Sequence, residues 1–211
     1  AIANDLLYDE LNSAVKNRYP SLHYLSVARA GPWKLFTNQK LETFDDLKGL
    51  KIRAPSIEGV IAGLEQVGAK PTVIPFNELY GALQQGVVDG MATLGNLMIT
   101  QKFYEVVKHC YQNDWGIGLD KQMINMNTWN NLGEKNQKVL TETFNELEPQ
   151  DFFRATEEAE ISNFKKWREI NGEDSTPLLD ATAAQKTLEP AIKNLADDIF
   201  GSGTYDRIQS I

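Results

Sequence analysis

Arg53 is the residue of this sequence whose type and position most clearly suggest chemistry. It lies in "GLKIRAPSIEGV", residues 49–60, between Ile52 and an Ala-Pro pair. A guanidinium that follows an apolar strand and precedes a proline turn is costly to bury without a partner. Its planar fork of N–H donors can hold a carboxylate through two parallel charge-assisted hydrogen bonds. The residue types alone leave two interpretations open: a ligand-binding arginine, or an arginine in a surface or structural ion pair.

Other side chains that suit ligand recognition lie at or near predicted strand ends: Trp33, Phe76, Thr93 and Trp115. In open parallel sheets, ligands bind beyond the carboxyl ends of the strands, at the point where strand order reverses. Either tryptophan could instead belong to a core or an interface, where indole rings are common. These positions therefore favour the recognition of a small ligand.

Catalytic signatures are missing from the sequence. It contains no P-loop, no Gly-x-Gly-x-x-Gly, no Gly-x-Ser-x-Gly elbow and no His-Glu-x-x-His. His23 and His109 stand far apart, and neither has a partner at a metal-ligand spacing. Cys110 is the only cysteine, so we expect neither a disulfide within the chain nor a cysteine-cluster metal site. We predict a protein that is not an enzyme and that uses no cofactor and no metal.

The composition is that of an ordinary globular protein. Of the 211 residues, 42% are hydrophobic and 24% charged, which is enough for one large domain or two small lobes. The net charge of −8 argues against a nucleic-acid binder or a basic membrane-surface module. No apolar run approaches the roughly 20 residues that span a bilayer. Residues 1–15 lack the features of a signal peptide and look like a helix from within a domain, which predicts that the chain begins inside a larger natural unit.

Strands and helices are predicted to alternate through the first half of the chain. Strands are expected over Leu22–Ala30, Lys34–Thr37, Leu50–Ala54, Lys70–Phe76 and Val87–Leu94. Helices are expected over Asn4–Arg18, from a cap at Ser56 to Gly68 and from Asn77 to Gly86, with a short capped turn over Thr43–Leu47. This alternation, with its short Gly/Pro turns, predicts a largely parallel sheet with right-handed crossovers.

The second half is predicted to be mainly helical. After a helix over Ile99–Val107 and a strand over Leu119–Asn127, amphipathic helix continues to Gly172. Pro149 falls inside it and is expected to kink or divide it. The segment "STPLL" could form a short strand, and two helices over Ala181–Phe200 and Thr204–Ile211 are expected to finish the chain.

The order of three motifs, "FDDLKGLKIRAP", "GAKPTVIPFNELYGALQQGVVDG" and "QKFYEVVKH", resembles that of a known family. It is similar to the solute-binding subunit of tripartite ATP-independent periplasmic (TRAP) transporters, the DctP-type family, whose pattern is close to "DLKGLKIRVP…LGA.PTPMPF.EVY.ALQ.GVVDG.ENP…KFYEV". The resemblance covers essentially the whole chain and is strongest over Thr43–Val107. It implies an α/β, two-lobed, periplasmic-binding-protein-like fold of class II type, with parallel-rich sheets, a long hinge-spanning helix and a ligand trapped between the lobes.

Family members have a substantial N-terminal region before the helix that opens this chain, so the first lobe is expected to be incomplete. The resemblance implies a lobe 1 remnant over residues 1–30, with a helix and a crossing strand. Lobe 2, the ligand-binding α/β lobe, is expected over 31–116. The return strand, the long helix and C-terminal helices that pack on both lobes are expected over 117–211. An incomplete lobe would expose apolar sheet surface, so self-association is also expected.

The resemblance also assigns roles to site residues. The arginine of the family's Lys-Ile-Arg-Val-Pro motif pairs with the substrate carboxylate, and this role falls to Arg53. Many members have an asparagine where this sequence has Thr93, and sialic-acid-type members have a second arginine where it has Trp33. The loss of a cation and the gain of an indole imply a less polar or aromatic carboxylate rather than a sugar acid. Lys34 and Arg29 are near enough in sequence to replace that cation.

The remaining site residues complete the expected pocket. Thr93 and Asn96 would supply hydrogen bonds, while Trp33, Phe76 and Trp115 would shape its apolar part. Phe76 could instead pack beneath the strand turn.

The resemblance predicts a periplasmic solute-binding subunit of a TRAP transporter, which captures a small organic carboxylate and delivers it to the membrane permease subunits. A ligand-sensing module that signals to a membrane receptor would use the same pocket, and the sequence of the domain does not separate the two. An enzyme is a third and weaker hypothesis, because no catalytic constellation is present.

Overall fold

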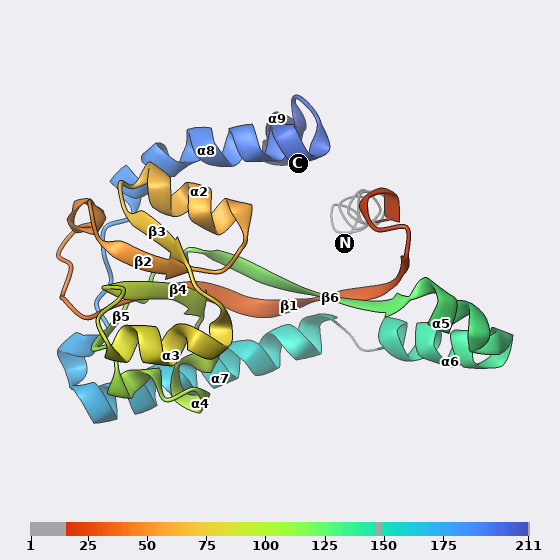
Figure 1. Ribbon diagram of the computed structural model, residues 1–211, viewed down its shortest axis with the longest axis horizontal. Coiled ribbons are helices and arrows are strands. Elements are labelled where there is room, and N and C mark those ends of the chain that lie inside the picture. The colour runs from red at the N-terminus through yellow and green to blue at the C-terminus, as the bar shows by residue number, and fades with distance from the viewer. Residues whose placement is uncertain (1–15, 147–148, 211) are drawn as a thin grey trace. The chain divides into compact units, whose positions relative to one another are not determined.

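The computed structural model of this protein describes residues 16–146 and 149–210, which form two compact units. Unit 1 contains the described residues 16–30, 119–146 and 149–156, and unit 2 contains 31–118 and 157–210. In the described part of the chain, three elements have residues in both units: β1 (Leu22–Thr37), β6 (Gly116–Asn125) and α7 (Pro149–Asn171) (Figure 1). The described residues of the segment 117–211 belong partly to unit 1 and partly to unit 2.

Unit 2 is built on a mixed sheet whose strand order is β3-β2-β4-β1-β5, with β6 paired to β1 outside this path. The parallel pairs join β2 (Lys51–Ala54) to β3 (Lys70–Val73) and to β4 (Gly90–Leu94). The antiparallel pairs join β1 to β4 and to β5 (His109–Cys110). The predicted βαβ crossovers are formed by α2 (Glu58–Gln66) and α3 (Phe76–Gln84).

Side chains alternate between the two faces of this sheet, as they must along any strand. Leu35, Ile52, Ala54 and Ala92 belong to a first core cluster, which also contains Val60 and Leu64 of α2. Phe36, Met91 and Cys110 belong to a second core cluster, which also contains Leu79 and Leu83 of α3 and Phe164 and Trp167 of α7. Unit 2 therefore has three layers, with helices on both faces of the sheet.

The remaining elements of unit 2 are short, except for one long C-terminal helix. They are η1 (Phe44–Leu47), α4 (Leu97–Thr100), η2 (Phe103–Glu105), η3 (Glu173–Ser175), α8 (Thr182–Phe200) and α9 (Thr204–Gln209). Unit 1 contains α5 (Met126–Asn131) and α6 (Gly133–Glu146). In it the His23 ring stacks on Trp129 at 3.7 Å, and Ser26 Oγ donates to Gln122 Oε1 at 2.8 Å. Within residues 16–146 and 149–210, no helix is long and apolar enough to cross a membrane.

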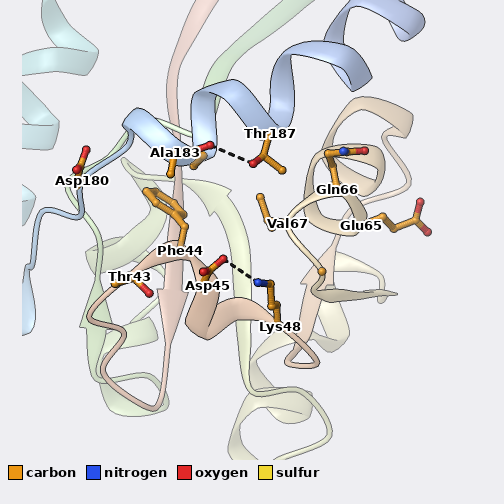
Figure 2. Close-up of a pocket in the computed structure, with 12 residues that line it drawn as sticks. Thr43, Phe44, Asp45, Lys48, Glu65, Gln66, Val67, Asp180, Ala183 and Thr187 are labelled. Atoms are coloured by element: carbon orange, nitrogen blue, oxygen red, sulfur yellow. Dashed lines mark hydrogen bonds and ion pairs between the residues drawn. The ribbon is translucent and has the colours of Figure 1, made fainter.

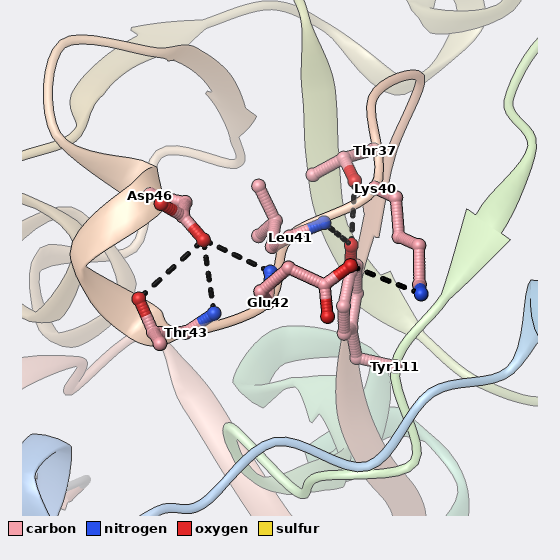
Figure 3. A network of polar contacts seen from close by, with 7 residues as sticks. All are labelled: Thr37, Lys40, Leu41, Glu42, Thr43, Asp46 and Tyr111. Atoms are coloured by element: carbon pink, nitrogen blue, oxygen red, sulfur yellow. Dashed lines mark hydrogen bonds and ion pairs between the residues drawn. The ribbon is translucent and has the colours of Figure 1, made fainter.

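Two polar side chains, Tyr111 and Asp46, form hydrogen bonds with the loop between β1 and β2 (Figure 3). The Tyr111 hydroxyl accepts a hydrogen bond from Leu41 N at 2.6 Å and lies 3.2 Å from Thr37 Oγ1. Asp46 Oδ2 accepts from the backbone N–H groups of Glu42 and Thr43, both at 2.9 Å, and so caps η1. These bonds fix the approach of the chain to β2.

Several predicted strand boundaries are wrong. The strand expected to begin at Val87 begins at Gly90, and the one expected over Leu119–Asn127 covers Gly116–Asn125. The break expected at "AGPW" is absent, because Gly31 takes a φ of 109° and Pro32 needs no N–H there. The Pro32 carbonyl instead accepts from Gly95 N at 3.0 Å, so β1 continues to Thr37. The strand expected to reach Phe76 ends at Val73, and Phe76 is instead the first residue of α3, with Pro75 as its N-cap.

Other predicted elements also differ from the structure. The helix expected over Ile99–Val107 is split into α4 and η2 by Lys102, whose φ is 54°. Ile57, not Ser56, is the N-cap of α2. "STPLL" forms no strand. Its Pro177 carbonyl accepts from Gln112 N at 3.0 Å, and its Leu179 N donates to Asn113 Oδ1 at 2.9 Å.

Pro149 divides the long helix, as expected, because α7 begins at this proline. The helix expected over Asn4–Arg18 lies outside the described residues except for 16–18, which are helical.

Gly90→Ala is expected to lower the free energy of unfolding by about 2 kcal/mol, the typical effect of overpacking. Gly90 opens β4, and a Cβ there would collide with the Phe36 carbonyl oxygen and lie 3.0 Å from Thr37 Cγ2. Gly81→Ala, within α3, is the control: no atom lies within 4 Å of its Cβ position, so it should stabilise by about 0.5–1 kcal/mol. Urea unfolding measures the free energy of unfolding of both variants. A change of the same sign in the two variants would contradict the packing described at Gly90.

Candidate functional site

Arg53 is buried at the carboxyl half of β2, with 3% of its surface exposed. Its neighbours Ile52 and Ala54 belong to the first core cluster, so Arg53 points to the opposite face of the sheet. Nε donates to the Ile74 carbonyl at 2.9 Å, and Nη1 lies 3.5 Å from the Ala92 carbonyl oxygen. The guanidinium carbon also lies 5.9 Å from the centroid of the Phe76 ring.

The charge of Arg53 is not balanced by an acidic side chain in the described residues. Across residues 16–146 and 149–210, none of the ion pairs within 4.0 Å involves Arg53. Burial lowers the pKa of its guanidinium from the ordinary value, which means that the charged form is poorly solvated. An arginine stays charged nonetheless. The site therefore holds a desolvated cation that an anion would stabilise.

Thr93 and Phe76 lie on the same side of the sheet as Arg53. Thr93 is 2% exposed and follows Ala92 of the first core cluster in β4, so it faces the opposite way. Phe76, at the start of α3, is 43% exposed, and its ring meets that of Phe103 edge-on at 6.2 Å. The structure thus brings a cation, a hydroxyl and an exposed aromatic ring to one face.

Asn96 follows β4 in the turn that leads to α4. It is partly buried, and its carbonyl accepts from Asn163 Nδ2 at 3.2 Å. Asn163 belongs to α7, so the turn that carries Asn96 is tied to that helix.

Trp33 and Trp115 are placed away from this face. Both pack against the first core cluster, with the Trp115 ring 6.0 Å from that of Phe44. Trp115 N donates to the Trp33 carbonyl at 2.8 Å. The structure does not bring the two indoles to the face of Arg53, and their contact with a ligand stays a prediction.

Lys34, expected as a replacement cation, is engaged elsewhere. It is 2% exposed, and its Nζ donates to the Gln112 carbonyl at 2.8 Å, to Asp114 Oδ1 at 2.5 Å and to Glu160 Oε1 at 2.8 Å. Burial opposes its charge, but the hydrogen bonds that Lys34 donates to Asp114 and Glu160 outweigh this effect and raise the pKa of Lys34. Its three N–H donors are therefore taken. The side chain of Arg29 lies outside the described part of the structure.

The sequence did not predict that Lys34 pairs with Asp114 and Glu160. Asp114 and Glu160 are distant along the chain, and no local pattern connects either carboxylate to Lys34.

A groove of about 430 Å³ lies elsewhere in unit 2, between η1, the end of α2 and the start of α8 (Figure 2). Asp45, Glu65 and Asp180 line it, and Lys48 there is paired with Asp45 at 2.9 Å. None of the predicted site residues lines this groove. Its charge is mainly negative, so it does not suit a carboxylate.

Comparison with known families gives one match that spans most of the chain. Residues 4–198 match the family DctP, described as "Bacterial extracellular solute-binding protein, family 7". The sialic acid-binding periplasmic protein SiaP of Vibrio cholerae is 30% identical over 136 residues, which are 64% of this chain and 42% of that protein. The C4-dicarboxylate-binding periplasmic protein DctP of Rhodobacter capsulatus is 29% identical over 169 residues, 77% of this chain and 49% of the relative.

Solved structures have the same fold. A TRAP periplasmic solute-binding protein from Desulfovibrio salexigens with bound orotic acid has a TM-score of 0.78 at 26% identity, covering 95% of this chain and 64% of that one. One from Citrobacter koseri with bound D-glucuronate has a TM-score of 0.81 at 18% identity, covering 95% and 65%. The chain thus spans less than half of the two curated relatives and about two thirds of these solved chains. It belongs to the DctP family of bacterial extracellular solute-binding proteins.

Proposed function

We propose that the protein carrying this chain is the periplasmic solute-binding subunit of a TRAP transporter, which captures a small organic carboxylate and delivers it to a membrane permease. The observation that carries this proposal is Arg53, a cation that is 3% exposed and has no acidic partner in the described residues. Membership of a solute-binding family supports it, as do relatives named for binding sialic acid and C4-dicarboxylates. The function is transport, and no reaction is proposed.

In this proposal Arg53 holds the ligand carboxylate and neighbouring groups complete the site. A guanidinium that already donates to two backbone carbonyls is fixed in orientation, so an acid would meet a preorganised cation. Thr93 and Asn96 supply hydrogen bonds from β4 and the turn after it. Phe76, beside the guanidinium, contacts the rest of the ligand.

The ligand proposed here has one carboxylate and an apolar or aromatic remainder. Lys34 cannot serve a second carboxylate, because its donors are held by Gln112, Asp114 and Glu160. Apolar side chains are exposed close in sequence to the carboxyl ends of β2 and β3: Ile57 is 46%, Val73 53% and Phe76 43% exposed. Such exposed apolar surface near a cation favours an acid with an apolar body.

Calorimetry with matched ligands tests the proposed function. A library of monocarboxylates would be titrated into the protein carrying this chain, and the best binder compared with its own primary amide. The amide should bind at least a hundredfold more weakly, because it leaves the Arg53 cation desolvated and without an anion. Equal affinity for acid and amide, or no binding across the library, would contradict the proposal.

A further inference from the structure

The Lys34 cluster consists of Lys34, Asp114, Glu160 and the carbonyl of Gln112. It lies close in sequence to the points where three elements enter or leave unit 2. Lys34 is on β1, shortly after residue 31, where β1 enters this unit. Asp114 precedes β6, which leaves the unit after residue 118. Glu160 is on α7, just after its entry at residue 157. One ammonium therefore bonds all three segments within unit 2.

The same cluster supports the segment that carries Thr93 and Asn96. Lys34 is directly opposite Thr93 in the antiparallel pair of β1 and β4. Gly95 packs on the cluster so closely that a Cβ there would lie 3.0 Å from Lys34 Cγ and 3.7 Å from Glu160 Cδ. Asn163, one turn after Glu160 on α7, donates to the Asn96 carbonyl at 3.2 Å. Residues 93–96 are thus held by strand pairing, by close packing and by a hydrogen bond from α7.

We propose that Lys34 and Glu160 are positioning residues for ligand binding, which fix residues 93–96 against α7 without touching the ligand. This inference rests on the proposed function, in which Thr93 and Asn96 face the carboxylate ligand. An ammonium has three N–H donors, and each has an acceptor here. Glu160 is the acceptor that α7 supplies, so without its charge Lys34 donates to charged or polar groups of residues 112–114 alone and its tie to α7 is weakened.

The two carboxylates of the cluster are not equivalent. The side chain of Glu160 is 15% exposed, whereas that of Asp114 is 57% exposed. Water can replace Asp114 as an acceptor more readily than it can replace Glu160. Glu160 is therefore the partner on which the position of residues 93–96 depends.

Glu160→Gln, compared with Glu158→Gln, tests the inference. Glu158 is exposed on the same helix, so its substitution is chemically identical but leaves the cluster intact. In the protein without ligand, Glu160→Gln should speed hydrogen exchange of the Gly95 and Met98 amides, which donate to the Pro32 and Gly95 carbonyls. With the best acid of the library, it should weaken binding about tenfold. Glu158→Gln should change neither quantity.

The pH dependence of ligand affinity distinguishes a positioning role of Glu160 from a purely structural one. Burial raises the pKa of Glu160, while Lys34 opposes this shift and Asp114 and Glu157 add to it. As the pH falls through this raised pKa, Glu160 takes up a proton and the cluster loses the charge that holds Lys34. The affinity of the unsubstituted protein should therefore fall on acidification more steeply than that of Glu160→Gln, which lacks this titration.

The outcomes separate this inference from the proposed function. If Glu160→Gln lowers only the melting temperature and leaves exchange at Gly95 unchanged, the inference is overturned. Faster exchange with unchanged affinity overturns it as well, since the segment would then move without consequence for the ligand. If no acid binds the unsubstituted protein, the proposed function fails, and the ligand role of the cluster fails with it, whatever the exchange experiment gives.

Discussion

Arg53→Met is expected to weaken carboxylate binding by about thirtyfold or more while leaving the unliganded protein nearly as stable as before. Loss of one partner of a desolvated charge pair costs about 2–5 kcal/mol of binding free energy. Without ligand, the variant loses the hydrogen bonds to the Ile74 and Ala92 carbonyls but also the cost of burying an unmatched cation. These effects oppose one another, so the free energy of unfolding should change by less than about 1 kcal/mol.

Lys51→Met is the matched control for this prediction. Lys51 is two residues before Arg53 on β2 and therefore on the same face, but it is exposed to solvent. Its loss should change carboxylate affinity by less than about threefold, because an exposed charge is well solvated. Calorimetry measures the affinities, and thermal unfolding with and without ligand measures the stabilisation that binding confers. An Arg53→Met variant that is still stabilised by the acid as strongly as the unsubstituted protein would refute the role of Arg53.

Lys34→Met is expected to lower the free energy of unfolding by about 3–5 kcal/mol, the cost of leaving a buried ion without its partner. Glu160, with a side chain only 15% exposed, would lose the cation that compensates its burial. For a protein of this size each kcal/mol lowers the melting temperature by about 2–4 °C, so a loss of about 10 °C should be seen. Lys48→Met is the surface control: its pair with Asp45 is 65% and 82% exposed, and its loss should cost less than about 1 kcal/mol.

The double variant Lys34→Met/Glu160→Leu completes the cycle. Replacing both members of a buried ion pair by apolar side chains is often neutral, so most of the lost stability should return. Urea unfolding of the single and double variants measures the coupling free energy. Additive losses in the double variant would show that the two side chains do not depend on each other.

Local signals predicted those parts of the fold that are set by single residues. Gly49, Gly68 and Gly86 were expected to end helices or turns, and each has a positive φ of 82°, 82° and 68°. Pro149 was expected to interrupt a long helix, and α7 begins there. The position of Arg53 after Ile52 was likewise predictable, since a strand followed by Ala-Pro fixes its place near a strand end.

The face on which each strand residue lies could not be predicted. The assumed break at "AGPW" left the alternation of Trp33 undefined, whereas a continuous β1 directs Trp33 to the first core cluster and Lys34 to the other face. A shift of one residue along a strand reverses every side chain, so one wrong boundary was enough. The pairing of Lys34 with Asp114 and Glu160 depends on the packed fold, for which no local sequence pattern exists.

The lone thiol of Cys110 has a practical consequence for studying this protein. Cys110 is the only cysteine of the chain, is fully buried in the second core cluster, and has a pKa that burial raises well above the ordinary value. An alkylating reagent can therefore modify it only in molecules whose core has opened. The rate of alkylation of Cys110 therefore reports how often the core of unit 2 opens. A cysteine placed on the surface could carry a fluorescent label without background from the native thiol.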